Sequence, residues 1–303
     1  MPLSTPLIKV NNTRSWGANV VLFGNSFDDA AAEAQRVVKE ENKIFVHPFD
    51  DFEVMAGQGT IGLELLEQNP DLDTVIVPVG GGGLISGIAC ALKEKKPSIR
   101  VIGVQPAVLP SMKLAMEEHK PVLIPAAKTL ADGLAVRLTG THTLAVCEKY
   151  VDEVVTVTES EVAQTLLTLL EKEKVVVEGA GAAAVAAVVH NKVKNLGKNV
   201  CCVVGGGNID VTTLARLIDK GLAESGRLAR LSVIIPDVPG SMATLTRLIA
   251  DTKANIDEIS HHRGFSDAIG KITVELTVET RGKEHVQELI KVLEDNGIKT
   301  TEL

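Results

Sequence analysis

Two periodicities alternate along the first two thirds of the chain. Short runs of β-branched and aliphatic residues are typical of buried strands, and longer segments with an apolar residue every three or four positions are typical of helices. The runs predict strands at residues 18–22, 43–46, 74–79, 99–104, 151–157 and 199–204, the last of them buried. The periodic segments predict helices at residues 7–14, 28–41, 84–92, 111–118, 158–173 and 212–223, with others ending near residue 68 and following residue 181. This alternation predicts an α/β fold with a mostly parallel sheet covered on both faces.

The last third of the chain has a shorter rhythm. Strands are predicted at residues 229–235, 255–262 and 271–278 and from residue 298, and helices at residues 241–251 and 283–295. The order βαββαβ is that of a ferredoxin-like unit. Ser225, Gly226 and Arg227 separate the two rhythms, so we expect one domain at residues 1–225 and a second at residues 226–303.

Four consecutive glycines stand between a predicted strand and a predicted helix. Gly80, Gly81, Gly82 and Gly83 follow the apolar run at residues 74–79. Backbone without side chains can approach a ligand closely, and the N-terminus of the following helix favours an anion. No Gly-Lys-Ser/Thr follows and the spacing is not GxGxxG, so neither a Walker loop nor a dinucleotide fingerprint is indicated. The interpretation is a phosphate cradle, and the alternative is a tight turn between strand and helix.

Composition narrows the class of protein. The chain has 303 residues, 23% charged and 45% hydrophobic, which is ordinary for a globular protein. Its net charge of -8 argues against a nucleic-acid surface. The four cysteines lack CxxC spacing, so we expect neither a disulfide framework nor a zinc site, and a reducing cytoplasm suits them. No apolar run is long enough to cross a membrane, and residues 1–14 lack the pattern of a signal peptide.

Six ordered motifs together resemble catabolic threonine dehydratases, which are threonine ammonia-lyases of the fold-type II pyridoxal-phosphate family. The motifs are TPLIKV at residues 5–10, GQGTIGLE at 57–64, PVGGGGL at 78–84, TLADG at 129–133, EGAG at 178–181 and GGNID at 206–210. Residues 231–263 resemble an ACT domain, which several of these enzymes carry at the C-terminus. The resemblance covers nearly the whole chain and implies a parallel-sheet body like that of tryptophan synthase β, truncated at its N-terminus, followed by a ferredoxin-like ACT domain.

The resemblance assigns the cofactor site by position. It implies that Gly80, Gly81, Gly82 and Gly83, together with Leu84, bind the phosphate of pyridoxal 5'-phosphate. It also implies that Glu178 lies near the cofactor ring and Gly205 near the pyridine nitrogen. Family members usually carry Ser or Cys where this chain has Gly205, so a hydrogen bond to the ring nitrogen is missing. Related enzymes bind a cation through an acidic side chain where this chain has Lys128, so we expect no metal.

Two family motifs do not occur in this sequence. In the family the lysine that forms the Schiff base lies in a Ser-Phe-Lys-x-Arg-Gly-Ala stretch, and a Ser-Gly-Asn-His loop holds the substrate carboxylate. Both would precede Thr5. Lys9, Lys43 and Lys93 are expected on the surface, so we name no catalytic residue. His47, in the loop His-Pro-Phe-Asp-Asp, is either a plain loop histidine or one with a chemical role.

The second unit contains candidate effector residues. Asp237, Pro239 and Gly240 form a predicted turn into a helix N-terminus that could contact an amino acid or serve simply as turn and cap, and Asn255 joins them by resemblance. The pair at residues 261–262, two histidines, is either solvent-facing or a contact to an effector or a second copy. Because an ACT sheet has edges and a face that a second copy commonly covers, we expect dimers or tetramers.

The resemblance implies deamination of L-threonine to 2-oxobutanoate and ammonia, and of L-serine to pyruvate, with regulation through the ACT domain by an amino-acid effector. Such a lyase belongs to amino-acid catabolism or isoleucine biosynthesis. Two alternatives stay open. One is racemisation of serine on the same scaffold, and the other is a non-catalytic amino-acid-binding regulatory protein, since the Schiff-base lysine segment is absent.

Overall fold

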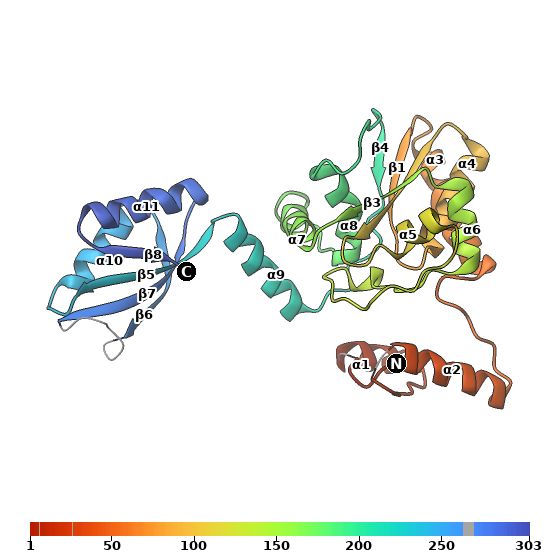
Figure 1. Ribbon diagram of the computed structural model, residues 1–303, viewed down its shortest axis with the longest axis horizontal. Coiled ribbons are helices and arrows are strands. Elements are labelled where there is room, and N and C mark those ends of the chain that lie inside the picture. Colours follow the sequence, from red (N-terminus) through yellow and green to blue (C-terminus); the bar gives the residue numbers. More distant parts are fainter. Residues whose placement is uncertain (6, 26, 263–269) are drawn as a thin grey trace.

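The computed structural model describes residues 1–5, 7–25, 27–262 and 270–303. Its two β-sheets lie in separate units that helix α9 connects (Figure 1). The strands of the larger unit are β1 Thr74–Pro78, β2 Arg100–Pro106, β3 Glu153–Val157 and β4 Val200–Cys202. Its helices are α1 Leu7–Ser15, α2 Phe27–Glu41, α3 Phe52–Gln68, α4 Gly83–Lys95, α5 Ser111–Glu118, α6 Thr141–Tyr150, α7 Glu159–Thr168 and α8 Gly179–Val189, followed by α9 Val211–Glu224. Short turns of other helix types lie at η1 Asp132–Leu134 and η2 Leu169–Glu173.

The larger sheet is parallel and has the order β3-β2-β1-β4. Successive residues of β1 point to opposite faces, so Ile76 packs into one hydrophobic cluster with α7 and α8, while Val75 and Val77 pack into a second cluster with α4, α5 and α6. Both clusters consist of buried residues between the sheet and the helices. Helices therefore cover both faces, and the expected α/β class is confirmed.

Helix α3 packs on α4 at very short range because both helices carry glycines at the contact. A methyl group on Gly87 would lie 2.1 Å from the Met55 carbonyl oxygen, and one on Gly62 would lie 2.9 Å from the Ile88 carbonyl oxygen. The carboxylate of Asp51 caps α3 by accepting hydrogen bonds from the N–H groups of Glu53 and Val54. The motif GQGTIGLE at residues 57–64 lies within α3, which spans Phe52–Gln68.

The fourth strand differs from its prediction. The run at residues 199–204 was expected to be a buried strand, but β4 covers three residues, all half-buried, at the edge of the sheet. An edge strand has a neighbour on one side, so its outer face is open to solvent. Helix α6 was not predicted, because its sequence THTLAVCEKY has a weak apolar periodicity.

The predicted strands at residues 18–22 and 43–46 are wrong: both segments lack regular secondary structure and belong to no sheet. The first is tied to the chain start, where the amino group of Met1 donates to Val21 and the N–H of Phe23 donates to Met1. In the second, Ile44 is 92% exposed. A β-branched pattern gives strand propensity, but a strand also needs a neighbour with which to form its ladder, and the described residues supply none.

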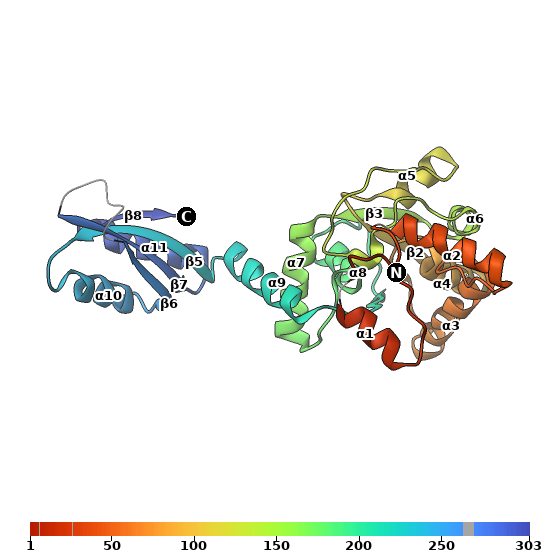
Figure 2. The same ribbon diagram turned by 90° about the horizontal axis from the view of Figure 1, so that it is seen from below.

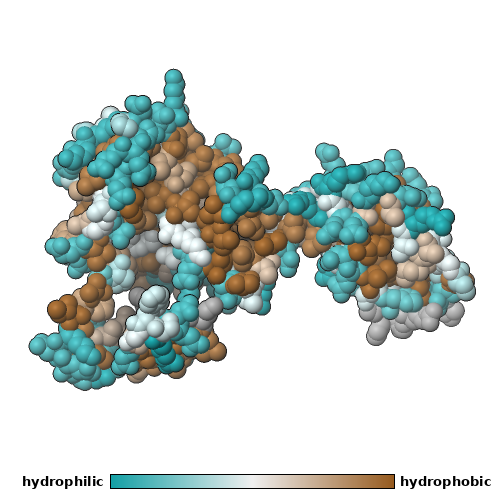
Figure 3. All heavy atoms as spheres, turned by 180° about the vertical axis from the view of Figure 1, so that it is seen from behind, coloured by the Kyte–Doolittle hydropathy of each residue, from teal (hydrophilic) through white to brown (hydrophobic). Residues whose placement is uncertain are grey.

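Helices α1 and α2 lie together on one side of the body (Figures 1 and 2). Apolar side chains show on this N-terminal segment at the lower left of Figure 3.

The second unit has the predicted βαββαβ order. It consists of β5 Leu228–Pro236, α10 Ser241–Asp251, β6 Asn255–His262, β7 Lys271–Glu279, α11 Lys283–Asp295 and β8 Lys299–Glu302. The sheet is antiparallel in the order β6-β7-β5-β8, and the two helices pack on one face over a hydrophobic cluster of their own. Nowhere in the described part of the chain is a helix both long and apolar enough to span a membrane.

The α3–α4 contact leads to a testable prediction. We expect Gly87→Ala to destabilise the protein by about 1–3 kcal/mol, because the added methyl group overpacks a contact made by backbone. The matched control is Gly57→Ala in α3, where nothing lies within 4 Å of the added methyl group. The control should be stabilising by about 0.5–1 kcal/mol through helix propensity. Urea unfolding of the three proteins checks this, and equal effects of the two substitutions would contradict the packing explanation.

Candidate functional site

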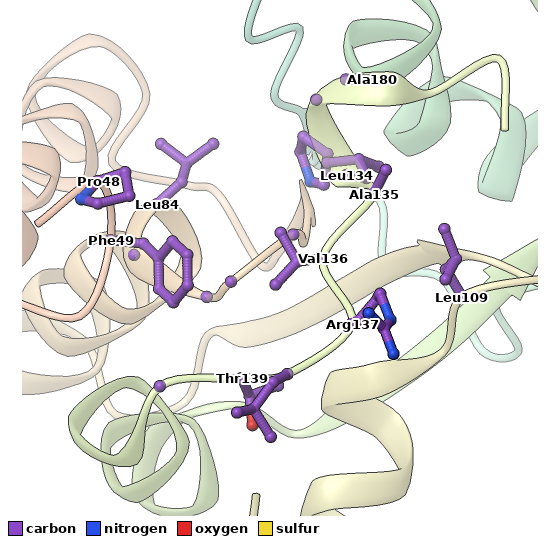
Figure 4. A pocket seen from close by; sticks show the side chains of 18 of the residues that line it. Pro48, Phe49, Leu84, Leu109, Leu134, Ala135, Val136, Arg137, Thr139 and Ala180 are labelled. Carbon is purple, nitrogen blue, oxygen red and sulfur yellow. The ribbon is translucent and has the colours of Figure 1, made fainter. Parts of the chain in front are cut away.

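A cleft of about 1150 Å³ opens beyond the carboxyl ends of the parallel strands. This is the usual position of ligand sites in open α/β sheets. The loop after β1 forms one wall, the loops at residues 132–141 and 178–181 form others, and residues 47–50 close a further side. Figure 4 shows Phe49 and Leu84 on one side of this cleft, with Val136 opposite and Arg137 and Leu109 beyond. The cleft therefore gathers segments that are far apart in the sequence.

The glycine loop presents a row of unpaired donors to this cleft. In the described part of the chain, nothing accepts a hydrogen bond from the backbone N–H groups of Gly80, Gly81, Gly82, Gly83 or Leu84. The three central glycines are buried. Buried N–H groups almost always have partners, so an unpaired row whose three central members are buried points to a ligand with several acceptor oxygens. They also lie at the N-terminus of α4, where no side chain caps the helix, and a phosphate group fits this donor set.

The shape of the loop depends on the absence of side chains. Gly82 has a φ of 98°, a conformation that L-residues rarely adopt, and a methyl group there would lie 2.5 Å from the Met112 side chain. On Gly80 a methyl group would lie 3.0 Å from the Gly133 carbonyl oxygen. The alternative of a plain tight turn would require one such glycine, whereas here several positions are constrained.

The other expected cofactor residues line the same cleft. Glu178 begins α8, and its backbone N–H donates to the Gly206 carbonyl at 3.1 Å. A methyl group on Gly205 would lie 3.9 Å from the Leu84 side chain, so the loop after β4 meets the glycine loop. The structure thus brings together Gly80, Gly81, Gly82, Gly83, Leu84, Glu178 and Gly205.

Glu178 lies in a partly buried, acidic environment. Burial raises the pKa of its carboxyl above the ordinary value of 4.5, the nearby Asp132 carboxylate raises it further, and Lys9 opposes both. Lys9 extends from α1 to form an ion pair of 3.2 Å with Asp132. Glu159 holds the loop that carries Asp132. Its carboxylate accepts one hydrogen bond from the hydroxyl of Thr129 and another from the backbone N–H of Leu130.

No lysine occurs among the described residues that line the cleft. The three lysines considered from the sequence form ion pairs: Lys9 with Asp132, a residue at the edge of the cleft, Lys43 with Glu41 at 2.7 Å, and Lys93 with Asp152 at 2.8 Å. Nor do three or more His, Cys, Asp or Glu side chains of the described residues gather in a way that could hold a metal ion. The charged and polar groups of the cleft are His47, Asp50, Asp132, Arg137, Thr139, Thr141 and Glu178.

Two features of the cleft were missed from the sequence. Phe49 contacts the glycine loop, and Asp50 contacts the start of α6. Both elements are distant from these residues in the sequence. Thr139 is 4% exposed, and its hydroxyl has no hydrogen-bond partner in the described structure. Nothing in the local pattern marks Thr139. The motif His-Pro-Phe-Asp-Asp, lying between two apolar segments, is the one signal that could have drawn attention to the first pair.

The expected effector residues do not come together within one copy of the chain. Asp237, Pro239 and Gly240 form the exposed turn between β5 and α10. Asn255 begins β6 at the opposite end of the sheet, where its amide donates to Glu279 at 3.0 Å. Of the histidine pair, His261 is exposed, and the side chain of the second member lies outside the described residues.

Comparisons with known proteins agree with this geometry. The model of the family described as pyridoxal-phosphate dependent enzyme matches residues 1–206, and the ACT domain model matches residues 229–297. An L-threonine ammonia-lyase of Geobacter sulfurreducens is 48% identical over 98% of this chain and 74% of its own length. One from Thermotoga maritima is 46% identical over the same shares.

Solved structures are similar to this chain in fold and in sequence. The processed form of threonine deaminase isoform 2 from Solanum lycopersicum has a TM-score of 0.68 and 35% identity, covering 72% of this chain and 64% of that one. Maize serine racemase has a TM-score of 0.67 and 33% identity, covering 74% and 69%. The chain therefore spans about two thirds to three quarters of the length of these proteins.

The raised pKa of Glu178 predicts a pH-dependent effect of Glu178→Gln. Below the ordinary value of 4.5 the carboxyl is protonated in folded and unfolded chains alike, so the variant should match the parent. As the pH rises through 4.5 and then through the higher folded value, keeping the carboxyl in the folded protein costs stability, so the variant should melt at a higher temperature at neutral pH. Melting curves from about pH 4 to 8 check this. A difference that is constant or reversed across this range would contradict it.

The unpaired hydroxyl of Thr139 leads to a second expectation. Thr139→Val replaces the hydroxyl by a methyl group of similar size and removes an unsatisfied buried oxygen, so it should stabilise the protein by about 1 kcal/mol. Thr143→Val is the matched control, because the Thr143 hydroxyl donates to the Gly81 carbonyl at 2.8 Å. The control should destabilise by about 1–3 kcal/mol. Urea unfolding distinguishes the two, and loss of stability in Thr139→Val would show that its hydroxyl is paired.

Proposed function

Because the chain belongs to the pyridoxal-phosphate-dependent enzyme family and ends in an ACT domain, we propose that it deaminates L-threonine to 2-oxobutanoate and ammonia, and more weakly L-serine to pyruvate. Pyridoxal 5'-phosphate is the cofactor of this family. The observation that carries the proposal is the row of unpaired N–H groups from Gly80 to Leu84, of which the three central residues are buried. Relatives named L-threonine ammonia-lyase that match nearly the whole chain support the choice of substrate.

We assign the cofactor phosphate to Gly80, Gly81, Gly82, Gly83 and Leu84. Glu178 would then lie beside the ring, and Gly205 would face the pyridine nitrogen with backbone alone. When bound, the cofactor withdraws electrons from the α-carbon of an amino acid and so acidifies its proton. This chain's residues bind and orient the cofactor, and the amine that would hold its aldehyde is not among the described lining residues.

The proposed organisation places the cofactor-binding domain at residues 1–225 and the regulatory ACT domain at residues 226–303. Each part has its own hydrophobic cluster. Helix α9 packs on α7, and an ion pair between Arg227 and Glu171 ties the start of the second unit to the first. We propose that an amino-acid effector bound by the second unit acts on the first through this connection.

Asp237, Pro239, Gly240 and Asn255 are the proposed effector contacts. Since the turn and Asn255 lie at opposite ends of the sheet, one site that uses both needs two copies of the chain. This supports a dimer or tetramer. The edge strands β6 and β8 and the helix-free face of the sheet offer surfaces for such an assembly.

The test measures 2-oxobutanoate formed from L-threonine by the purified protein with pyridoxal 5'-phosphate, with pyridoxal as the control that lacks the phosphate. We expect product above the rate of the cofactor alone, dependence on the phosphate, and an increase when a primary amine such as ethylamine is added, because no lysine is among the described lining residues and an added amine can take the α-proton. Cofactor retained with no keto acid would contradict the proposal and favour a non-catalytic binding protein. D-serine formed from L-serine without pyruvate would instead favour racemisation, the activity named for the maize relative.

A further inference from the structure

The glycine loop is covered by an aromatic side chain from residues 47–51, which we call the strap. A methyl group on Gly81 would lie 2.4 Å from Cγ and Cδ2 of the Phe49 ring, and one on Gly83 would lie 3.0 Å from Cα and Cβ of Phe49. Phe49 thus lies directly on the loop whose N–H groups have no partner in the described structure. An aromatic ring offers these donors no acceptor oxygen, so the contact leaves them unpaired.

The other walls of the loop belong to the core. Met112 and Thr143, which flank Gly82, are both 0% exposed. Phe49 is half-buried and lies in a segment without helix or strand. Of these three neighbours, Phe49 can therefore move at the lowest cost in packing.

Two sets of hydrogen bonds hold the strap in place. The Nδ1 atom of His47 accepts from the backbone N–H of Asp50 at 2.8 Å and of Phe49 at 3.2 Å. Its ring meets the Phe49 ring edge to face at 4.7 Å. Since Nδ1 accepts, the neutral ring carries its proton on Nε2.

At the other end of the strap, Asp50 caps helix α6. Its carboxylate accepts from the backbone N–H groups of Thr141 at 3.1 Å, His142 at 2.9 Å and Thr143 at 3.0 Å. A carboxylate at a helix N-terminus is favoured by the helix dipole. Asp50 and His47 together thus fix the backbone on both sides of Phe49.

We propose that the strap is a gate over the phosphate cradle, with Phe49 as the cover and His47 as the positioning residue that keeps it closed. The proposal rests on the cofactor site of the proposed function. An incoming phosphate reaches the N–H groups of the glycine loop when Phe49 leaves Gly81, and entry therefore depends on opening of the strap. Removing the cover or its support should accelerate entry.

The experiment measures the association rate of pyridoxamine 5'-phosphate by stopped-flow fluorescence. This probe carries the phosphate and the ring but cannot form an imine with a lysine, so it reports on the cradle. We expect Phe49→Ala to raise the association rate about ten- to a hundredfold, since the ring no longer has to move. Phe52→Ala is the matched control: Phe52 is 61% exposed and contacts His142, and the rate should stay within twofold of the parent.

The role of His47 is tested by two variants. His47→Ala removes the acceptor for the two strap N–H groups and should also raise the association rate. His47→Asn keeps an acceptor oxygen at this position and should restore a rate close to that of the parent. A purely structural role would lower the melting temperature of both variants without this difference in rate.

An unchanged or slower association rate in Phe49→Ala, with a folded protein by circular dichroism, would overturn the proposal. Phe49→Leu, which keeps an apolar side chain, should give an intermediate rate and protects the test if the alanine variant does not fold. Absence of binding in the parent and in every variant would overturn both the gate and the cofactor site. Faster binding without any 2-oxobutanoate from L-threonine would overturn the proposed activity and leave the gate standing.

Discussion

The arrangement of this protein depends on five backbone N–H groups that have no partner within the described structure. They follow the central strand β1, in a loop of glycines at the N-terminus of α4. Three of the five belong to buried glycines, Gly81, Gly82 and Gly83, and a buried unpaired N–H costs free energy comparable to a lost hydrogen bond, so the row favours a ligand that supplies acceptors. The neighbouring loops carry Glu178 and Gly205 into the same cleft, which supports the proposal that the unpaired row binds the phosphate of the cofactor.

The second constraint is the close approach of backbone segments at glycines, both in the glycine loop and between α3 and α4. The loop can lie against its surroundings because its residues lack side chains, and α4 can lie against α3 because Gly87 and Gly62 do. The same feature allows Phe49 to rest on Gly81. The glycines thus allow close packing along α4 and leave a loop without side chains at its N-terminus. The strap at residues 47–51 contacts this loop and leads directly into α3.

Local chemistry explains what the sequence predicted correctly. The glycine loop follows β1, and the βαββαβ order of the second unit is as expected, because each depends on residues close together in the chain. The strands expected at residues 18–22 and 43–46 are absent because a ladder needs a partner that local pattern does not reveal. The positions of Phe49 and Thr139 in the site depend on contacts with distant segments: the motif His-Pro-Phe-Asp-Asp draws attention to Phe49, but no local signal marks Thr139.

The most direct test of the unpaired row is a nuclear magnetic resonance titration of protein labelled with ¹⁵N-glycine. Adding pyridoxamine 5'-phosphate should shift the amide resonances of Gly80, Gly81, Gly82 and Gly83 downfield, as expected when an N–H donates to a phosphate oxygen, and pyridoxamine without the phosphate should not. Glycines distant from the cleft, such as Gly57 and Gly297, should stay unchanged. Binding that shifts other glycines and leaves these four in place would contradict the assignment of the cradle.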